Sequence, residues 1–178
     1  MKNNYSRLTF PALFNQTVQK FGDSSAYAFV GEEPLTYSDA SRLIKAVSAF
    51  LEKNGVNPGD RIAILSNNMP NWPVAYFGIT FMGAVAVPIL PEFSAVEVAN
   101  VLEHSEAKVL FVSSGLLSRI ENFKSENLAT IIQIEDFSFI SSRENSALFD
   151  PDAVPLKEYN CLLYTSPSPR DRTRSRMP

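Results

Sequence analysis

The most constraining feature of the sequence is a regular alternation of short apolar runs with helix-like segments. The apolar runs begin near residues 61, 85, 108 and 130, about one strand–helix–strand step apart. Short β-rich runs with helices between them are typical of a parallel sheet whose two faces are both covered. The sequence therefore predicts an α/β fold, with a parallel sheet flanked by helices on both faces.

The segment before this alternation carries its own helix and turn signals. Thr9 and a following proline open a helix with apolar residues at helical spacing, and Gly22 is predicted to stop it. Residues 26–30 and 35–37 then predict two short strands joined by a turn. A second helix follows, for which Ser38 or Asp39 is the expected cap.

Further along, two expected helices and one irregular stretch complete the chain. Ser94 and Glu97 match a capping box, in which a hydroxyl and a carboxylate satisfy free backbone N–H groups. Residues 72–82 and 116–123 also predict helices, the first rich in aromatic side chains. Residues 136–160 are less regular and are expected to form a loop or an incomplete element.

Composition excludes several classes of protein. At 178 residues the chain suits one domain, and its 45% hydrophobic and 20% charged content is that of soluble globular proteins. A net charge of −3 argues against nucleic-acid binding, which requires a basic face. Apolar runs are all shorter than a membrane span, so at most a peripheral membrane association is expected. The single cysteine, Cys161, fits a reducing cytosol, and a cytoplasmic location is predicted.

The last 18 residues differ from the rest. Residues 161–178 hold four Arg and one Asp, a net of +3, which leaves −3 − 3 = −6 for residues 1–160. With three Pro and no apolar period, this basic tail is predicted to be disordered. It also resembles translated sequencing-adapter sequence. We therefore expect a partial domain in residues 1–160 and a tail foreign to the native protein.

The side chains that could act in catalysis or metal binding are more simply explained by structural roles. His104 is the only histidine, which excludes histidine metal clusters, and its place near a helix end suits a cation. Glu97, Glu103 and Glu106 are spaced as a solvated helix face. No dinucleotide, Walker or nucleophile-elbow motif occurs. No catalytic, cofactor-binding or metal-binding residue is therefore predicted.

Two further observations concern aromatic side chains and glycines. Trp72, Tyr76, Phe77 and Phe81 could line a ligand pocket, but their spacing favours a helix face packed on the sheet. Gly115 is the last glycine in the sequence. A loop that wraps phosphates with backbone N–H groups needs glycines, so none is expected after that position.

Several ordered motifs carry a resemblance to a known family. Residues 55–64 (GVNPGDRIAI), 68–72 (NMPNW) and 83–91 (GAVAVPILP) strongly resemble the N-terminal region of adenylate-forming enzymes, and acyl-CoA synthetases in particular. The upstream run 35–40 (LTYSDA) is similar to the first core motif of that family. Departures are mild, since Asn71 replaces the usual Glu before Trp72. The variant at 88–91 (PILP), together with 104–106 (HSE), is most similar to bacterial long-chain fatty acid ligases.

The resemblance implies a ligase that uses ATP, Mg and CoA. A fatty acid and ATP would give an acyl-adenylate and pyrophosphate, after which the CoA thiol displaces AMP. In the family, the phosphate loop, the metal-binding motif, the ribose-binding Asp and the mobile-domain lysine all lie beyond the matching region. In some relatives the segment at the position of residues 90–92 touches CoA, although this chain lacks their Gly pair there. The chain is therefore expected to be an inactive N-terminal part of such an enzyme.

A second hypothesis stays open. The chain could instead be a self-contained, flavodoxin-like α/β module that binds a partner or a small ligand without catalysis. A phosphate-receiving module of that kind would carry acidic residues after its first strand. Here Ser66, Asn67 and Asn68 occupy that position, which favours the ligase interpretation.

Overall fold

The computed structural model describes residues 9–142 and 146–155. Its main sheet has five strands in the order β4-β3-β5-β6-β7. The strands are β3 (Arg61–Leu65), β4 (Val85–Ile89), β5 (Val109–Val112), β6 (Thr130–Gln133) and β7 (Phe139–Ser141). The first four are parallel, and β7 runs antiparallel to β6. The predicted parallel sheet is confirmed, and each of its strands begins within one residue of the expected position.

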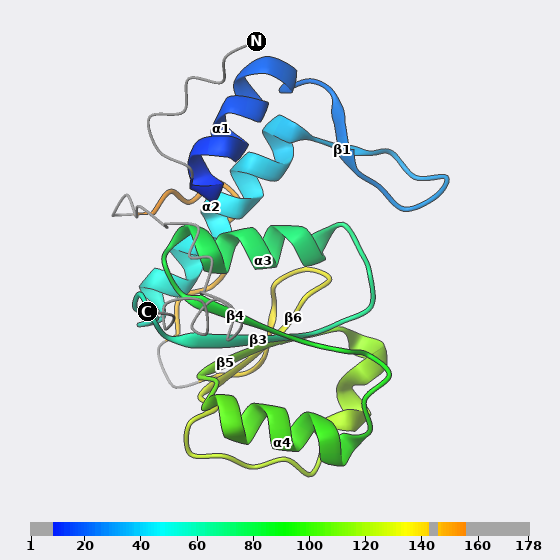
Figure 1. Ribbon diagram of the computed structural model, residues 1–178, viewed down its shortest axis with the longest axis vertical. Coiled ribbons are helices and arrows are strands. Elements are labelled where there is room, and N and C mark those ends of the chain that lie inside the picture. Colours follow the sequence, from blue (N-terminus) through cyan, green and yellow to red (C-terminus); the bar gives the residue numbers. More distant parts are fainter. Residues whose placement is uncertain (1–8, 143–145, 156–178) are drawn as a thin grey trace, which may run out of the picture.

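Helices cover both faces of this sheet, as predicted (Figure 1). One face carries α1 (Phe10–Phe21), α2 (Tyr37–Lys53) and α3 (Asn71–Phe81). The other carries α4 (Ala95–Ser105) and the 3₁₀ helix η1 (Ser114–Arg119). The α/β fold class predicted from the sequence is therefore confirmed.

The strand side chains alternate between two separate cores. Ile62 and Ile64 of β3 face the α1–α3 core, whereas Ala63 and Leu65 face the α4–η1 core. Because successive side chains of a strand point to opposite faces, a strand buried on both faces is apolar at every position. This explains why the apolar runs are continuous rather than alternating with polar residues.

The contact between α2 and α3 depends on one glycine. A Cβ added to Gly78 would lie 2.5 Å from Val47 Cγ1, too close for any side chain. The buried Ser48 hydroxyl donates a hydrogen bond to the Gly78 carbonyl at 2.7 Å. The absence of a side chain at Gly78 therefore brings the two helices together.

The N-terminal elements differ from the prediction at their boundaries. The small antiparallel sheet consists of β1 (Ser25–Tyr27) and β2 (Leu35–Thr36), so both strands are shorter than expected. Thr36, rather than Ser38 or Asp39, caps α2, and Asp39 is the partner that completes its capping box. Gly22 does not end α1 with a left-handed residue. Its role is spatial, since a Cβ there would lie 2.7 Å from the Ser38 hydroxyl.

Two segments near the C-terminal end differ in detail from the prediction. The helix expected at 116–123 is the short 3₁₀ helix Ser114–Arg119, whose cap makes no side-chain hydrogen bond. Such helices have poorer hydrogen-bond geometry and rarely run long. The stretch 136–160, expected to be a loop or an incomplete element, contributes the strand Phe139–Ser141.

Residues 146–155 form a strap that lies along α2. The Asn54 side chain accepts a hydrogen bond from the Ala147 amide and donates one to its carbonyl, both at 2.9 Å. The Phe149 ring packs against Phe50, with the ring centroids 5.8 Å apart. The strap thus covers the α1–α3 core where β7 ends the sheet.

The predicted basic tail and the predicted domain end at residue 160 lie outside the described residues. None of the helices within residues 9–142 and 146–155 is both long enough and apolar enough to cross a bilayer.

Candidate functional site

The carboxyl edge of the parallel strands is the first place to look for a site. The chain leaves β3 for β4 on one side and then crosses to β5 on the other, so the strand order reverses between β3 and β5. Open α/β sheets bind ligands at such a switch point, outside the carboxyl ends of the strands. In this chain, Ser66 follows β3 and Ser113 follows β5.

Hydroxyl and carboxylate groups gather at this edge. The buried Ser66 hydroxyl donates to the Asn67 carbonyl at 2.8 Å. The Ser113 hydroxyl is also buried and has no hydrogen-bond partner among the described residues. The amide and hydroxyl of Ser114 both donate to Glu135, at 2.8 and 2.9 Å. The Ser114–Glu135 contact joins the ends of β5 and β6, and among the described residues no base lies in hydrogen-bond contact with either buried hydroxyl to activate it.

Glu135 was not singled out from the sequence. It follows β6, and the Asn71 side chain at the start of α3 donates to its carbonyl at 2.7 Å. Its position could have indicated it, because Glu135 follows an apolar run that predicts a parallel strand. The residues after such a strand lie at the carboxyl edge of the sheet. The sequence did identify the polar Ser66, Asn67 and Asn68 after β3.

The predicted acidic residues occupy a solvated helix face, as expected. Glu97 completes the capping box of α4, and the hydrogen bond from the Ser94 side chain lowers the pKa of Glu97. Glu103 is exposed. Glu106 ends α4 in the left-handed conformation and forms an ion pair with Arg61. Glu97 and Glu106 therefore have different partners, and the three carboxylates do not form a paired acid site.

His104 lies in the last turn of α4, where the helix dipole favours a cation, and its side chain is exposed. Because α4 runs back from the carboxyl edge of the sheet, this turn lies at the opposite edge. His104 is therefore not brought near Ser66 or Ser113. Within residues 9–142 and 146–155, no cluster of three or more His, Cys, Asp or Glu side chains could hold a metal ion.

The aromatic side chains of α3 pack differently from the prediction. Phe77 and Phe81 contact the Phe14 ring of α1, with centroids 5.6 and 5.8 Å apart. Trp72 and Tyr76 stack on each other along α3. The sequence correctly indicated a packed helix face, but its partner is α1, because the smaller side chains of α3 are its fully buried ones.

Residues 90–92 lie in the turn after β4, at the carboxyl edge. Leu90 is exposed, with 59% of its surface accessible. The contact with CoA that the family resemblance implies for this segment stays a prediction. Gly115, the last glycine of the sequence, lies in η1, where an added Cβ would meet nothing within 4 Å.

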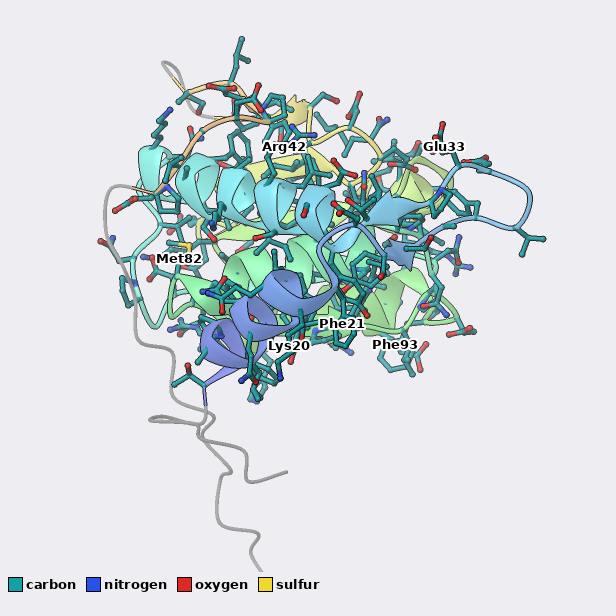
Figure 2. The ribbon with its side chains drawn as sticks, turned by 90° about the horizontal axis from the view of Figure 1, so that it is seen from above. Lys20, Phe21, Glu33, Arg42, Met82 and Phe93 are labelled. Atoms are coloured by element: carbon teal, nitrogen blue, oxygen red, sulfur yellow. The ribbon has the colours of Figure 1, made fainter. Side chains whose placement is uncertain are left out.

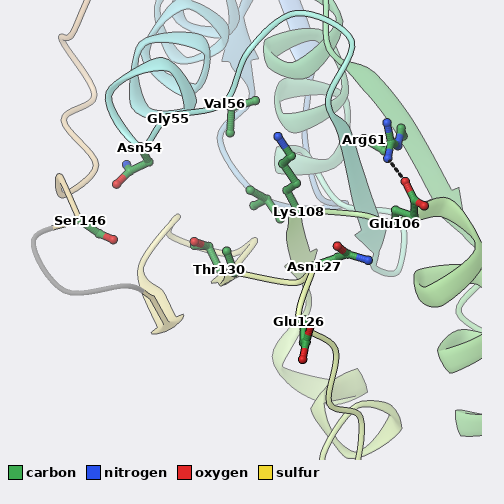
Figure 3. A pocket seen from close by; sticks show the side chains of 12 residues that line it. Asn54, Gly55, Val56, Arg61, Glu106, Lys108, Glu126, Asn127, Thr130 and Ser146 are labelled. Atoms are coloured by element: carbon green, nitrogen blue, oxygen red, sulfur yellow. Dashed lines mark hydrogen bonds and ion pairs between the residues drawn. The ribbon is translucent and has the colours of Figure 1, made fainter.

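The amino edge of the sheet carries a polar cavity of about 330 Å³ (Figure 3). Arg61 and Lys108 line it, but each cation is compensated: Arg61 pairs with Glu106, and Lys108 with Asp60 at 2.7 Å. Burial raises the pKa of Asp60, but hydrogen bonds from Lys108 and the Asn57 amide outweigh it, so that the pKa lies below its usual value. These two ion pairs stabilise the amino edge of the sheet and the turn before β3, and they leave neither Arg61 nor Lys108 as a free cation for a ligand.

Comparison with known proteins identifies the family. The AMP-binding enzyme family matches residues 14–168, most of the chain. A 3-[(3aS,4S,7aS)-7a-methyl-1,5-dioxo-octahydro-1H-inden-4-yl]propanoyl:CoA ligase of Rhodococcus jostii is 30% identical over 71% of this chain and 25% of its own length. The long-chain-fatty-acid–CoA ligase of Bacillus subtilis is 27% identical over 71% of this chain and 22% of its own length.

Solved structures agree with this assignment. The N-terminal domain of FACL13 from Mycobacterium tuberculosis superposes with a TM-score of 0.60 and 25% identity, covering 66% of this chain and 31% of that domain. The chain thus spans about a quarter of the length of the curated relatives it matches. Its mostly parallel sheet and flanking helices match the N-terminal part of adenylate-forming enzymes. The chain belongs to the AMP-binding enzyme family.

Proposed function

We propose that this chain is the N-terminal part of an AMP-forming acid–thiol ligase, and that its described residues form scaffold rather than catalytic machinery. The complete enzyme would convert a carboxylic acid, ATP and CoA into an acyl-CoA, AMP and pyrophosphate. The long-chain-fatty-acid–CoA ligase of Bacillus subtilis bears such an activity in its name. For this chain, the activity is inferred from membership of the family.

One observation carries the proposal beyond sequence similarity. The two best-matching motifs, 55–64 and 83–91, meet at the amino edge of the sheet. The Gly59 amide donates to the Gly83 carbonyl at 2.9 Å, and the Val85 amide donates to the Asp60 carbonyl at 2.8 Å. Both glycines have positive φ, 86° and 81°. The motif residues therefore join β3 to β4, a structural role that requires glycine at both positions.

The described residues do not fit Mg-ATP. A phosphate cradle needs a glycine-rich turn or a helix N-terminus with free N–H groups, together with a cation. At the start of α3, Pro73 has no N–H and the Trp72 amide is already bonded to the Met69 carbonyl. No catalytic step is therefore assigned to these residues, and we expect the chain alone to be inactive.

The test has two parts. Sequencing the genomic DNA beyond codon 160 should reveal a reading frame that continues into a Ser/Thr/Gly-rich phosphate loop. The purified 178-residue chain should give no ATP–pyrophosphate exchange with any fatty acid. A stop codon directly after residue 160, or a clear exchange signal from the chain alone, would contradict the proposal.

The finer proposal, on substrate specificity, is that the carboxylic acid substrate of the complete enzyme is a long-chain fatty acid. It rests on the residue pattern at 88–91 and 104–106, and the similar ligases of Bacillus subtilis and Escherichia coli carry that substrate in their names. Assaying the continued reading frame with palmitate, benzoate and 4-coumarate should show preference for palmitate. Preference for an aromatic acid would reject the finer proposal and leave the ligase assignment intact. A cytoplasmic location and a peripheral membrane association are likewise proposals about the complete enzyme.

The flavodoxin-like module stays a second hypothesis because of one observation. The order β4-β3-β5-β6 is the 2-1-3-4 order of flavodoxin-like sheets. The antiparallel β7 departs from that pattern. The DNA test above separates the two hypotheses, since an independent module predicts no phosphate loop downstream.

A further inference from the structure

Asn54 and Gly55 form the only Asn-Gly pair in the sequence. In such a pair the glycine nitrogen can attack the side-chain carbonyl carbon of the asparagine, because glycine has no side chain to obstruct the approach. The pair lies at the end of α2, where Asn54 is the C-cap and Gly55 has a φ of 80°. Since the Asn54 side chain also binds the strap of residues 146–155, a chemical change at this residue would alter a tertiary contact.

The groups of this pair that would react are engaged in hydrogen bonds. The Asn54 NH₂ group donates to the Phe50 carbonyl at 2.8 Å and to the Ala147 carbonyl at 2.9 Å, and its oxygen accepts from the Ala147 amide. The attacking nitrogen, that of Gly55, donates to the Glu52 carbonyl at 3.1 Å. The reaction needs the nitrogen and the carbon in contact and correctly aligned, whereas these bonds hold the two groups on other partners. Two of the three side-chain bonds go to the strap, so the strap contributes most of this restraint.

Beyond this anchor, the strap contacts α2 through an ion pair and a ring. Figure 2 shows the strap running beside α2, where Arg42 binds the Asp152 carboxylate at 3.2 Å. The Phe149 ring packs against Phe50. The strap contains no helix or strand of its own. A segment of this kind opens locally at a lower free-energy cost than a core strand, so the Asn54 side chain should be released without unfolding of the sheet.

We propose that Asn54 is a site of spontaneous deamidation, and that the strap controls the rate of this reaction. When the strap is open, the Gly55 nitrogen loses its proton to solvent and bonds to Cγ of Asn54, while the Cγ–Nδ2 bond breaks and the nitrogen takes up a proton and leaves as ammonia. One water molecule then opens the five-membered imide, at Cγ to give aspartate or at the backbone carbonyl carbon to give isoaspartate. Water is the only co-reactant, and no oxidation or reduction occurs. This inference concerns the chain itself and does not depend on the proposed ligase chemistry.

The product binds the strap less well than asparagine does. A carboxylate has no N–H, so the bonds to the Phe50 and Ala147 carbonyls are lost and a negative oxygen faces two carbonyl oxygens. The new charge also lies at the C-terminal end of α2, where the helix dipole is negative. Isoaspartate in addition routes the backbone through the side chain, which displaces the cap of the helix. The modification therefore disfavours reclosing of the strap, and the change runs in one direction.

The first experiment compares the 178-residue chain with a blocked peptide of residues 50–56, which has no strap. Both are incubated at mildly alkaline pH, and the aspartate and isoaspartate formed at Asn54 are measured by peptide mapping with mass spectrometry. The chain should react at least about tenfold more slowly than the peptide, because only the fraction of molecules with an open strap reacts. Equal rates would overturn the proposal. So would an Asn54 that stays unmodified in the chain and in both strap variants described below while the peptide reacts.

Two variants weaken the strap without changing the Asn-Gly pair. Phe149→Ala removes the ring that packs on Phe50, and Ala147→Pro removes the N–H that donates to Asn54. Each should raise the rate of deamidation about threefold or more, because the strap is open for a larger fraction of the time. Phe123→Ala is the matched control, since its ring packs on the α4–η1 face and its loss should leave the rate unchanged. Circular dichroism identifies the variants that stay folded. Equal acceleration in Phe123→Ala, or no acceleration in a folded strap variant, would show that the strap does not control the reaction.

A final comparison tests the consequence for the strap. Asn54→Asp reproduces the aspartate product, and Asn100→Asp adds the same charge at an exposed position of α4. Limited proteolysis within residues 146–155 should be several-fold faster in Asn54→Asp than in the parent chain, and unchanged in Asn100→Asp. A strap that is equally protected in Asn54→Asp would overturn its release by the modification.

Discussion

The two faces of the sheet are covered by different numbers of helices and apolar side chains. The α1–α3 face has three helices, an aromatic cluster and the strap of residues 146–155 over it. The α4–η1 face has one helix of 11 residues and a 3₁₀ helix of six. Since stabilisation scales with buried apolar area, the first face should contribute most of the free energy of unfolding. The second face should respond less to substitution.

The largest expected effect is truncation of a ring in the deeper core. Phe50 is 1% exposed and contacts the rings of Phe139 and Phe149. Phe50→Ala should lower the free energy of unfolding by about 3–5 kcal/mol. Leu116→Ala, on the thinner face and 9% exposed, should cost about 2 kcal/mol. Urea unfolding of both variants measures the difference, and a larger loss for Leu116→Ala would reverse the comparison.

The next effect tests the close approach of α2 and α3. Gly78→Ala places a Cβ against Val47 and should cost about 1–3 kcal/mol from overpacking. Gly115→Ala is the matched control, because its Cβ meets nothing within 4 Å, so its unfolding midpoint should hardly change. Combining Gly78→Ala with Val47→Ala should recover part of the loss. A double variant less stable than the sum of the two singles would contradict the steric account.

A smaller effect tests whether the strap belongs to the deeper face. Asn54→Ala removes both hydrogen bonds to Ala147 and should cost about 1–2 kcal/mol. It should also make residues 146–155 more susceptible to limited proteolysis. Asn127→Ala is the control, because its side chain lies at the exposed amino edge. Unchanged proteolysis in Asn54→Ala would show that other contacts hold the strap.

The smallest effect concerns pH and should be common to both faces. Hydrogen bonds from Thr36 and Ser94 lower the pKa of Asp39 and Glu97 in the capping boxes of α2 and α4. A carboxyl group whose pKa is lower in the folded state stabilises the fold above its unfolded pKa, about 4. That contribution is lost as pH falls through the folded pKa. Thermal midpoints measured from pH 6 to pH 2 should therefore fall less in the variant Asp39→Asn/Glu97→Gln, and an identical pH profile would contradict this.

The sequence by itself determined the sheet and its strand positions. Continuous runs such as residues 61–65 report burial on both faces, a local property that needs no knowledge of the neighbours. The capping box at Ser94 was likewise predicted from the sequence, since its two partners are only three residues apart.

Only the tertiary structure decided which elements meet. The rings of α3 pack on α1, and Glu135 binds Ser114, although nothing in the spacing of these residues indicates their partners. Residues 139–141 became a strand because β6 supplied hydrogen-bond partners, in a stretch whose own pattern is weak. One cavity is lined by Glu32 and Glu33 of the β1–β2 hairpin and by Glu135, about a hundred residues along the chain. Local propensity is carried by adjacent residues, whereas sites and cores arise from contacts between distant ones.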